Sequence, residues 1–135
     1  MTDLGVFLGK SIEIDYREDA VMRKKGFKGR CEKRALSKCA DVCRTYDAIQ
    51  YAFADVLQSS EAIKQFRCNV PLDGLDIGDY MTDFVCIKAD NDLMVRECVN
   101  RRFLTKPLTV KLLDASRNYW MRRGITDWGI VIDAE

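Results

Sequence analysis

The sequence predicts an α/β domain with a mixed sheet and the element order helix, strand, strand, strand, helix, strand. Apolar residues recur at helical spacing over long stretches without Gly or Pro. Short runs of β-branched and aromatic residues lie between turn residues. A helix separates the last two strands, which favours a parallel pair. With 135 residues and 47% hydrophobic content, we expect one domain, over residues 31–135.

The first half of the chain is expected to contain an arm, a long helix and a strand. Residues 1–30 include KKGFKGR and little periodicity, so we interpret them as a basic arm or loop. The segment from Cys31 to Gln58 predicts one helix, or two with a break near Thr45, because apolar residues recur close to every 3.6 positions. The alternating run Ile63 to Val70, which ends at Pro71, predicts the first strand.

The second half is expected to hold a hairpin and a last strand. The runs YMTDFVCIK (80–88) and LMVRECV (93–99) are joined by a tight polar turn, which predicts an antiparallel pair. The run WGIVI (128–132) is almost wholly apolar, and we expect it in a central position in the sheet.

A second helix is expected between the hairpin and the last strand. It follows Pro107 and passes through Val110, Leu113, Tyr119 and Trp120. Its expected N-cap is Thr109 and its expected C-terminal stop is Gly124.

Charge and hydropathy limit the classes of function. The net charge is +1, but basic residues outnumber acidic ones from Arg17 to Arg44 and from Arg96 to Arg123, and acidic residues dominate between them. Such a pattern suits a protein that attracts phosphates and holds a divalent cation, although solvated helix faces also produce it. No stretch is apolar for the roughly 20 residues that a membrane span needs, and the N-terminus lacks a signal-peptide pattern. We therefore expect a cytoplasmic protein.

Six cysteines without an export signal indicate buried thiols rather than disulfides. Cys86 and Cys98 lie in apolar, strand-like runs. Cys31, Cys39 and Cys43 have the one spacing that merits a test for metal, since Cys39 and Cys43 would share a helix face. The lack of histidine and of a CxxC pair disfavours zinc there.

Asp83 and Glu97 are the informative carboxylates. They stand on the two strands of the expected hairpin, where they can lie opposite each other and hold Mg²⁺ or Mn²⁺. Asp47 or Asp55 on the first helix could add a ligand. Alternatively, Asp83 ends a strand and Glu97 pairs with Arg96, Arg101 or Arg102 at the surface. A cation site requires both carboxylates to reach one solvent-accessible point.

Several segments resemble the N-terminal nuclease domain of TnsA, the endonuclease subunit of heteromeric bacterial transposases. FRCNVPL (66–72) is similar to the family's REQ-x-PL strand end, and MTDFV (81–85) to its PDF segment. VRECV (95–99) stands at its E/Q-x-K strand, and LTKPLTVKLLDASRNYW (104–120) with RRGITDWGIVI (122–132) is similar to its next helix and last strand. The resemblance covers about two thirds of the chain. It implies a restriction-endonuclease-like PD-(D/E)XK core.

The family's site residues transfer only in part. Asp83 matches the metal-binding aspartate and Glu97 the E/Q position, so both are expected catalytic and metal-binding residues, with Asp47 assisting. Val99 stands where the family has its catalytic lysine, and Gln50 stands on or near its helix glutamate. A displaced cation could replace that lysine, because the lysine supports developing negative charge. The candidates are Arg96, Arg101, Lys106 and Lys111, although strand alternation turns Arg96 away from Glu97.

Three functions follow. The first is a Mg²⁺- or Mn²⁺-dependent DNA endonuclease of a transposition or other mobile-element system. Its implied partners are DNA, a transposase subunit and an ATPase regulator, and homo-oligomerisation stays open. The second is an inactive nuclease fold that binds DNA or docks a protein. The third, a regulator with an exposed aromatic surface, is disfavoured because Tyr119, Trp120 and Trp128 fit a buried helix-to-sheet contact. The expected DNA-binding residues are Lys24, Lys25, Lys28, Arg30, Arg101, Arg102 and Lys106.

Overall fold

A computed structural model describes residues 31–75 and 80–133. The basic arm expected at 1–30 therefore lies outside the described residues, and so do its candidate DNA-binding residues Lys24, Lys25, Lys28 and Arg30. The described elements are β1 (Glu32–Arg34), β2 (Cys43–Thr45), α3 (Ala48–Ser59), β3 (Ile63–Leu72), β4 (Tyr80–Lys88), β5 (Leu93–Val99), the 3₁₀ turn η2 (Arg101–Phe103), α4 (Pro107–Arg122) and β6 (Trp128–Ile132).

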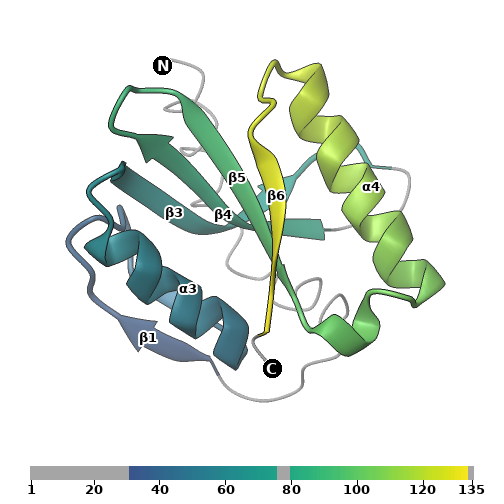
Figure 1. Ribbon diagram of the computed structural model, residues 1–135, viewed down its shortest axis with the longest axis horizontal. Helices are drawn as coiled ribbons and strands as arrows, with labels where there is room; N and C mark the ends of the chain where they lie inside the picture. The colour runs from purple at the N-terminus through teal and green to yellow at the C-terminus, as the bar shows by residue number, and fades with distance from the viewer. Residues whose placement is uncertain (1–30, 76–79, 134–135) are drawn as a thin grey trace.

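The main sheet has the strand order β3-β4-β5-β6 (Figure 1). β3, β4 and β5 pair antiparallel, whereas β6 runs parallel to β5. The α/β class, the mixed sheet, the hairpin and the parallel final pair are therefore confirmed. β1 and β2 form a separate two-stranded antiparallel sheet.

The two helices cover opposite faces of the main sheet. Val85 and Val95 point toward α4 and belong to a core that includes Trp120. Their strand neighbours Phe84 and Met94 belong to a second core with α3. Because successive strand side chains point to opposite faces, this alternation separates the two cores. No helix in the described ranges has both the length and the apolar character needed to cross a membrane.

The long first helix expected from Cys31 to Gln58 is wrong in its first half. Only Ala48–Ser59 is helical, and the preceding residues form the short β1–β2 hairpin. Cys39 pairs with Phe66 of β3 in an isolated parallel bridge. The Lys38 carbonyl accepts a 2.9 Å hydrogen bond from the Phe66 amide. These long-range pairings override the helical periodicity of the segment.

The later elements keep their expected type but differ in detail. Lys106, not Thr109, is the N-cap of α4, because Pro107 can occupy the first helical position without losing a needed amide. Gly124 ends the helix as expected, in a left-handed conformation with φ 82°. β6 is an edge strand rather than a central one, and Ile130 is 42% exposed. Its apolar character therefore does not report its position in the sheet.

One irregularity sets the orientation of several polar side chains. Within β3, Cys68 packs with the α3 core, whereas Val70 packs with the α4 core. Two residues apart on a regular strand, they would share a face. Asn69 between them has φ 56°, a left-handed conformation that reverses the faces. Asp83 lies between the paired positions Cys68↔Phe84 and Val70↔Thr82, opposite this reversal.

Candidate functional site

Asp83 of β4 and Glu97 of β5 lie close together inside the sheet. Their relative exposures are 1% and 0%, so neither carboxylate reaches solvent. The backbone amide of Asp83 donates a 3.1 Å hydrogen bond to Glu97 Oε1. The expected proximity of the two residues is present. The surface pairing of Glu97 with Arg96, Arg101 or Arg102 does not fit, because Glu97 is fully buried.

Each of the four carboxylate oxygens accepts a hydrogen bond from the protein. Asp83 Oδ2 accepts from the Cys98 amide at 2.6 Å, and Asp83 Oδ1 accepts from Gln50 Nε2 at 3.3 Å. Besides the Asp83 amide on Oε1, Glu97 Oε2 accepts from Ser116 Oγ at 2.6 Å. Buried charges are tolerated when such donors replace water.

The two carboxylates connect the helices on opposite faces. Gln50 on α3 is fully buried, and its Nε2 also donates to Asn69 Oδ1 at 2.9 Å. Ser116 on α4 is fully buried, and its hydroxyl accepts from Trp128 Nε1 at 3.0 Å. The hydrogen-bonded network thus runs from α3 through β4 and β5 to α4 and β6.

The local strand geometry explains why carboxylates occupy these positions. The register between β4 and β5 runs from Ile87↔Leu93 to Phe84↔Arg96. At the next positions, the Asp83 side chain accepts a hydrogen bond from the Cys98 amide, and the Glu97 side chain accepts one from the Asp83 amide. Side-chain oxygens therefore take the role that backbone carbonyls have in a regular ladder.

The other expected acidic ligands serve different partners. Asp47 is the N-cap of α3, and its Oδ1 accepts from the Gln50 amide at 2.8 Å. Asp55 forms a 2.6 Å ion pair with Arg34. In the described ranges, no group of three or more potential metal ligands includes a carboxylate. Asp47 and Asp55 are thus not gathered with Asp83 and Glu97.

The candidate replacements for the family lysine have other contacts as well. Arg96 forms a 2.9 Å ion pair with Asp127 and donates to the Val95 and Asp127 carbonyls. Arg101 donates to the Asp133 carbonyl at 3.2 Å. The Lys106 ammonium lies 5.9 Å from the ring centroid of Phe103. Val99 itself is a buried apolar residue.

The expected DNA-binding residues of the described part are exposed and close in the fold. Arg101 and Arg102 belong to η2, which directly follows β5, and Lys106 caps α4. All three are exposed, as are further basic residues of α4 and its C-cap. The outer surface from η2 along α4 is formed by a segment that contains the exposed cations Arg101, Arg102, Lys106, Lys111, Arg117, Arg122 and Arg123 and one acidic residue, Asp114, while Asp133 accepts a 2.6 Å hydrogen bond from the Arg101 amide.

A polar hollow of about 340 Å³ lies elsewhere, beside the β4–β5 turn and the loop before β6. Lys88, Asp92, Arg123 and Asp127 are among its lining residues. Lys88 pairs with Asp127 across 2.8 Å, so the charges in the hollow largely neutralise one another. Asp83 and Glu97 do not line it, and the hollow gives them no route to solvent.

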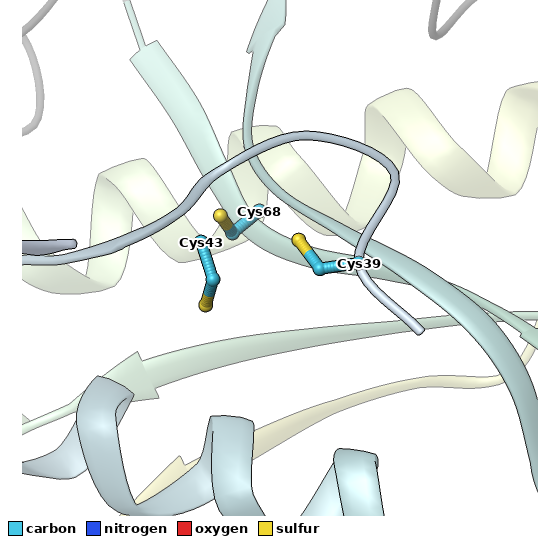
Figure 2. A group of neighbouring side chains, drawn as sticks. All are labelled: Cys39, Cys43 and Cys68. Carbon is cyan, nitrogen blue, oxygen red and sulfur yellow. The ribbon is translucent and has the colours of Figure 1, made fainter. Parts of the chain in front are cut away.

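Three cysteines form a second cluster, beside the α3 face of β3 (Figure 2). The sulfur atoms of Cys39, Cys43 and Cys68 all lie within 4.8 Å of one another. The expected trio of Cys31, Cys39 and Cys43 is therefore wrong in one member and in its helical setting. Cys68 was missed because it lies on a distant strand. The paired spacing of Cys39 and Cys43 was the only signal in the sequence.

The thiols of the cysteine cluster shift the pKa values of one another through hydrogen bonds. The pKa of Cys39 is lowered, first because Cys43 and Cys68 donate side-chain hydrogen bonds to its sulfur. The Asp41 amide and the charge of Arg67 act in the same direction. The pKa of Cys68 is raised, chiefly because it donates to Cys39. All six cysteines are free thiols.

No protein-family model and no curated protein matches the chain.

Proposed function

We propose that the chain is a TnsA-like protein of restriction-endonuclease-like fold that binds DNA without hydrolysing it. This corresponds to the second function expected from the sequence. The observation that carries the proposal is the saturation of Asp83 and Glu97, since every carboxylate oxygen accepts a protein hydrogen bond in a solvent-excluded position.

The element order supports the nuclease fold. A helix precedes three antiparallel strands, and a second helix leads to a strand parallel to the third. Asp83 and Glu97 stand on the two strands where the resemblance to TnsA expects them, and Gln50 reaches Asp83 from the first helix. The element order and the placement of these three residues support the PD-(D/E)XK interpretation of the chain.

The residues present do not fit the Mg²⁺ or Mn²⁺ that the family implies. Mg²⁺ retains several water molecules and takes oxygen ligands in octahedral geometry. Gln50 directs its amide N–H groups at Asp83, in the position where a family glutamate would add negative charge. Val99 supplies no charge to support a developing phosphorane or orient water. We therefore assign the carboxylates a structural role.

The outer surface from η2 along α4 supports DNA binding. Its exposed cations outnumber its acidic residues, and Arg101, Arg102 and Lys106 among them lie at the end of the sheet where β5 finishes and α4 starts. Lys and Arg contacts to phosphates supply most sequence-independent affinity for duplex DNA. In a mobile-element system, this surface would engage DNA while a transposase subunit cuts it.

The DNA-binding test uses fluorescence anisotropy with a short duplex and the full chain. We expect affinity to fall as salt rises, because bound cations release counterions from DNA. Arg102→Ala combined with Lys106→Ala is expected to weaken binding about tenfold and to reduce the salt slope by about 2. Lys64→Ala is the matched control, since this exposed cation contacts Asn91 near the opposite end of the sheet. An affinity insensitive to salt or to the double substitution would contradict the proposal.

The cleavage test separates this proposal from the endonuclease hypothesis. Supercoiled DNA is incubated with the native chain, Asp83→Ala and Glu97→Ala, each with Mg²⁺ or Mn²⁺. We expect the same background nicking from all three proteins. Metal-dependent cleavage by the native chain that is lost in both variants would establish the endonuclease instead.

A further inference from the structure

Three sulfur atoms lie where the segment around β2 packs against β3, and the proposed DNA-binding function does not use them. Cys39 lies in the loop before β2, Cys43 is the first residue of β2, and Cys68 belongs to β3. Cys39 and Cys43 are almost fully buried, at 8% and 0% exposure, and Cys68 is half-buried. Residues far apart in sequence thus bring three thiols to one point.

Backbone contacts fix this arrangement independently of the thiols. The Cys39 amide donates to the Leu36 carbonyl at 3.0 Å, which closes a turn. Ala40 donates to the Phe66 carbonyl at 3.3 Å, and Phe66 donates to the Lys38 carbonyl. The left-handed conformation of Asn69 follows Cys68, which remains with the α3 core as the strand changes faces. The sulfur positions are therefore preorganised by the fold.

We propose that Cys39, Cys43 and Cys68 bind one thiophilic metal ion, with Zn²⁺ as its physiological occupant. Their sulfur atoms lie within 4.8 Å of one another, a separation that permits three thiolates to converge on one tetrahedral ion with Zn–S bonds of about 2.3 Å. Binding displaces the thiol protons, which pass to solvent as three sulfur–metal bonds form.

The surroundings suit a negatively charged thiolate cluster. The Asp41 amide donates a hydrogen bond to the Cys39 sulfur, as second-shell amides do in metal–thiolate centres. The guanidinium groups of Arg67 and Arg34 lie near Cys39 and Cys43, respectively, and they also pair with Asp41 at 2.8 Å and Asp55 at 2.6 Å.

Sulfur ligands decide the class of metal. Thiolates select Zn²⁺ and Cu⁺ over Mg²⁺, Ca²⁺ and Mn²⁺, which prefer oxygen. The chain has no histidine, and no carboxylate of the described ranges joins the trio. Within these ranges, three sulfurs therefore complete the protein ligand set, and the fourth tetrahedral position falls to water or another added ligand. The ion would join the β2 segment to the main sheet.

The test titrates the reduced full chain with Zn²⁺ under anaerobic conditions and repeats the titration with Co²⁺, whose absorption reports thiolate coordination. We expect one ion per chain, with cobalt–thiolate charge-transfer bands. Cys39→Ser, Cys43→Ser and Cys68→Ser should each weaken Zn²⁺ binding at least a hundredfold. Cys31→Ser is the matched control, because this half-buried thiol is not in the cluster and should retain full binding.

A second measurement needs no variant. Differential alkylation followed by mass spectrometry, with and without Zn²⁺, should show metal-dependent protection of Cys39, Cys43 and Cys68 and unchanged labelling of Cys31. Absence of stoichiometric Zn²⁺ uptake by the reduced chain would overturn the proposal. Equal affinity in the three cluster variants, or protection confined to other cysteines, would overturn it as well. Circular dichroism of each variant verifies that lost binding occurs in a folded chain.

Discussion

The carboxylate pair and the cysteine cluster are both buried groups of potential metal ligands, but their atoms are arranged differently. Around Asp83 and Glu97, donors from two strands and two helices reach each carboxylate oxygen. In the cysteine cluster, the three sulfur atoms instead lie within 4.8 Å of one another, and two of the thiols donate to the third. Carboxylates that accept hydrogen bonds from several elements connect those elements. Three sulfur atoms gathered at one point can instead act together as ligands of a cation.

A residue that has the right charge for a metal ion need not have atoms that are free to bind one. A carboxylate pair suggests a divalent cation by its chemistry alone, and the sequence interpretation rested on that. The cysteines suggested buried thiols, and only the spacing of Cys31, Cys39 and Cys43 merited a test for metal. A further residue distinguishes the two clusters. Gln50 donates a hydrogen bond to the carboxylate pair, whereas Cys68 adds a third sulfur to Cys39 and Cys43. Each of these residues comes from another part of the chain.

The largest expected effect breaks the carboxylate network. Glu97→Ala should lower the free energy of unfolding by about 4 kcal/mol, because it leaves a cavity and strands the Ser116 hydroxyl and the Asp83 amide. Glu97→Gln retains the shape and one acceptor, so its expected loss is about 1–2 kcal/mol. Urea denaturation of the three proteins measures both. A Glu97→Ala variant as stable as the native chain would contradict a structural role.

Zinc should produce the next largest effect, through the cysteine cluster. Zn²⁺ at one hundred times its dissociation constant should stabilise the reduced chain by about 2.7 kcal/mol if the unfolded state does not bind it. A chelator should reverse the increase in melting temperature. Mg²⁺ at the same concentration as Zn²⁺ should leave the melting temperature unchanged. An equal shift with both ions would remove the contrast between the two clusters.

Gln50→Glu sharpens the comparison by restoring a family-like helix acid. The new carboxylate would face Asp83 and lose the amide donors that reach Asp83 and Asn69. We expect it to lower the free energy of unfolding by about 2 kcal/mol at neutral pH. Gln50→Met removes the donors and also the Oε1 acceptor of the Tyr46 amide without adding charge, and it should still cost less because it places no anion beside Asp83. The same denaturation series compares them, and the reverse order would argue against repulsion at Asp83.

The smallest expected effect concerns Asp127, which lies outside both clusters. Hydrogen bonds and charge from Lys88 and Arg96 lower the pKa of this carboxyl. Its contribution is therefore present above the unfolded-state pKa of about 3.9 and is lost as pH falls through the lower folded-state value. Because the side chain is one third exposed, about 0.5 kcal/mol is expected. The stability difference between the native chain and Asp127→Asn should shrink between pH 5 and pH 2, and a constant difference would contradict the assignment.

The hairpin and the second helix could be predicted because their signals are local. Alternation and turn residues located Tyr80–Lys88 and Leu93–Val99, and helical periodicity located α4. The β1–β2 segment could not be predicted, since its fold depends on the bridge from Cys39 to Phe66. The central position expected for β6 was wrong for a related reason. An apolar strand is consistent with any place in a sheet until its neighbours are known.

The site was predicted in its residues but not in its environment. Asp83 and Glu97 were expected on adjacent strands and lie there. Their donors were beyond sequence reasoning, because Gln50, Ser116 and the Cys98 amide reach them only after the helices pack on opposite faces. The position of Cys68 beside Cys39 likewise depends on the bridge from Cys39 to Phe66, which the sequence pattern did not reveal.

The most direct measurement is Mn²⁺ binding to the reduced full chain, followed by electron paramagnetic resonance, with Asp83→Asn as the matched variant. If protein donors occupy the carboxylates, the native chain and the variant will leave equal amounts of free Mn²⁺ at every concentration. A stoichiometric Mn²⁺ site in the native chain that disappears in Asp83→Asn would contradict the structural role of the pair and would return Asp83 and Glu97 to metal-dependent chemistry.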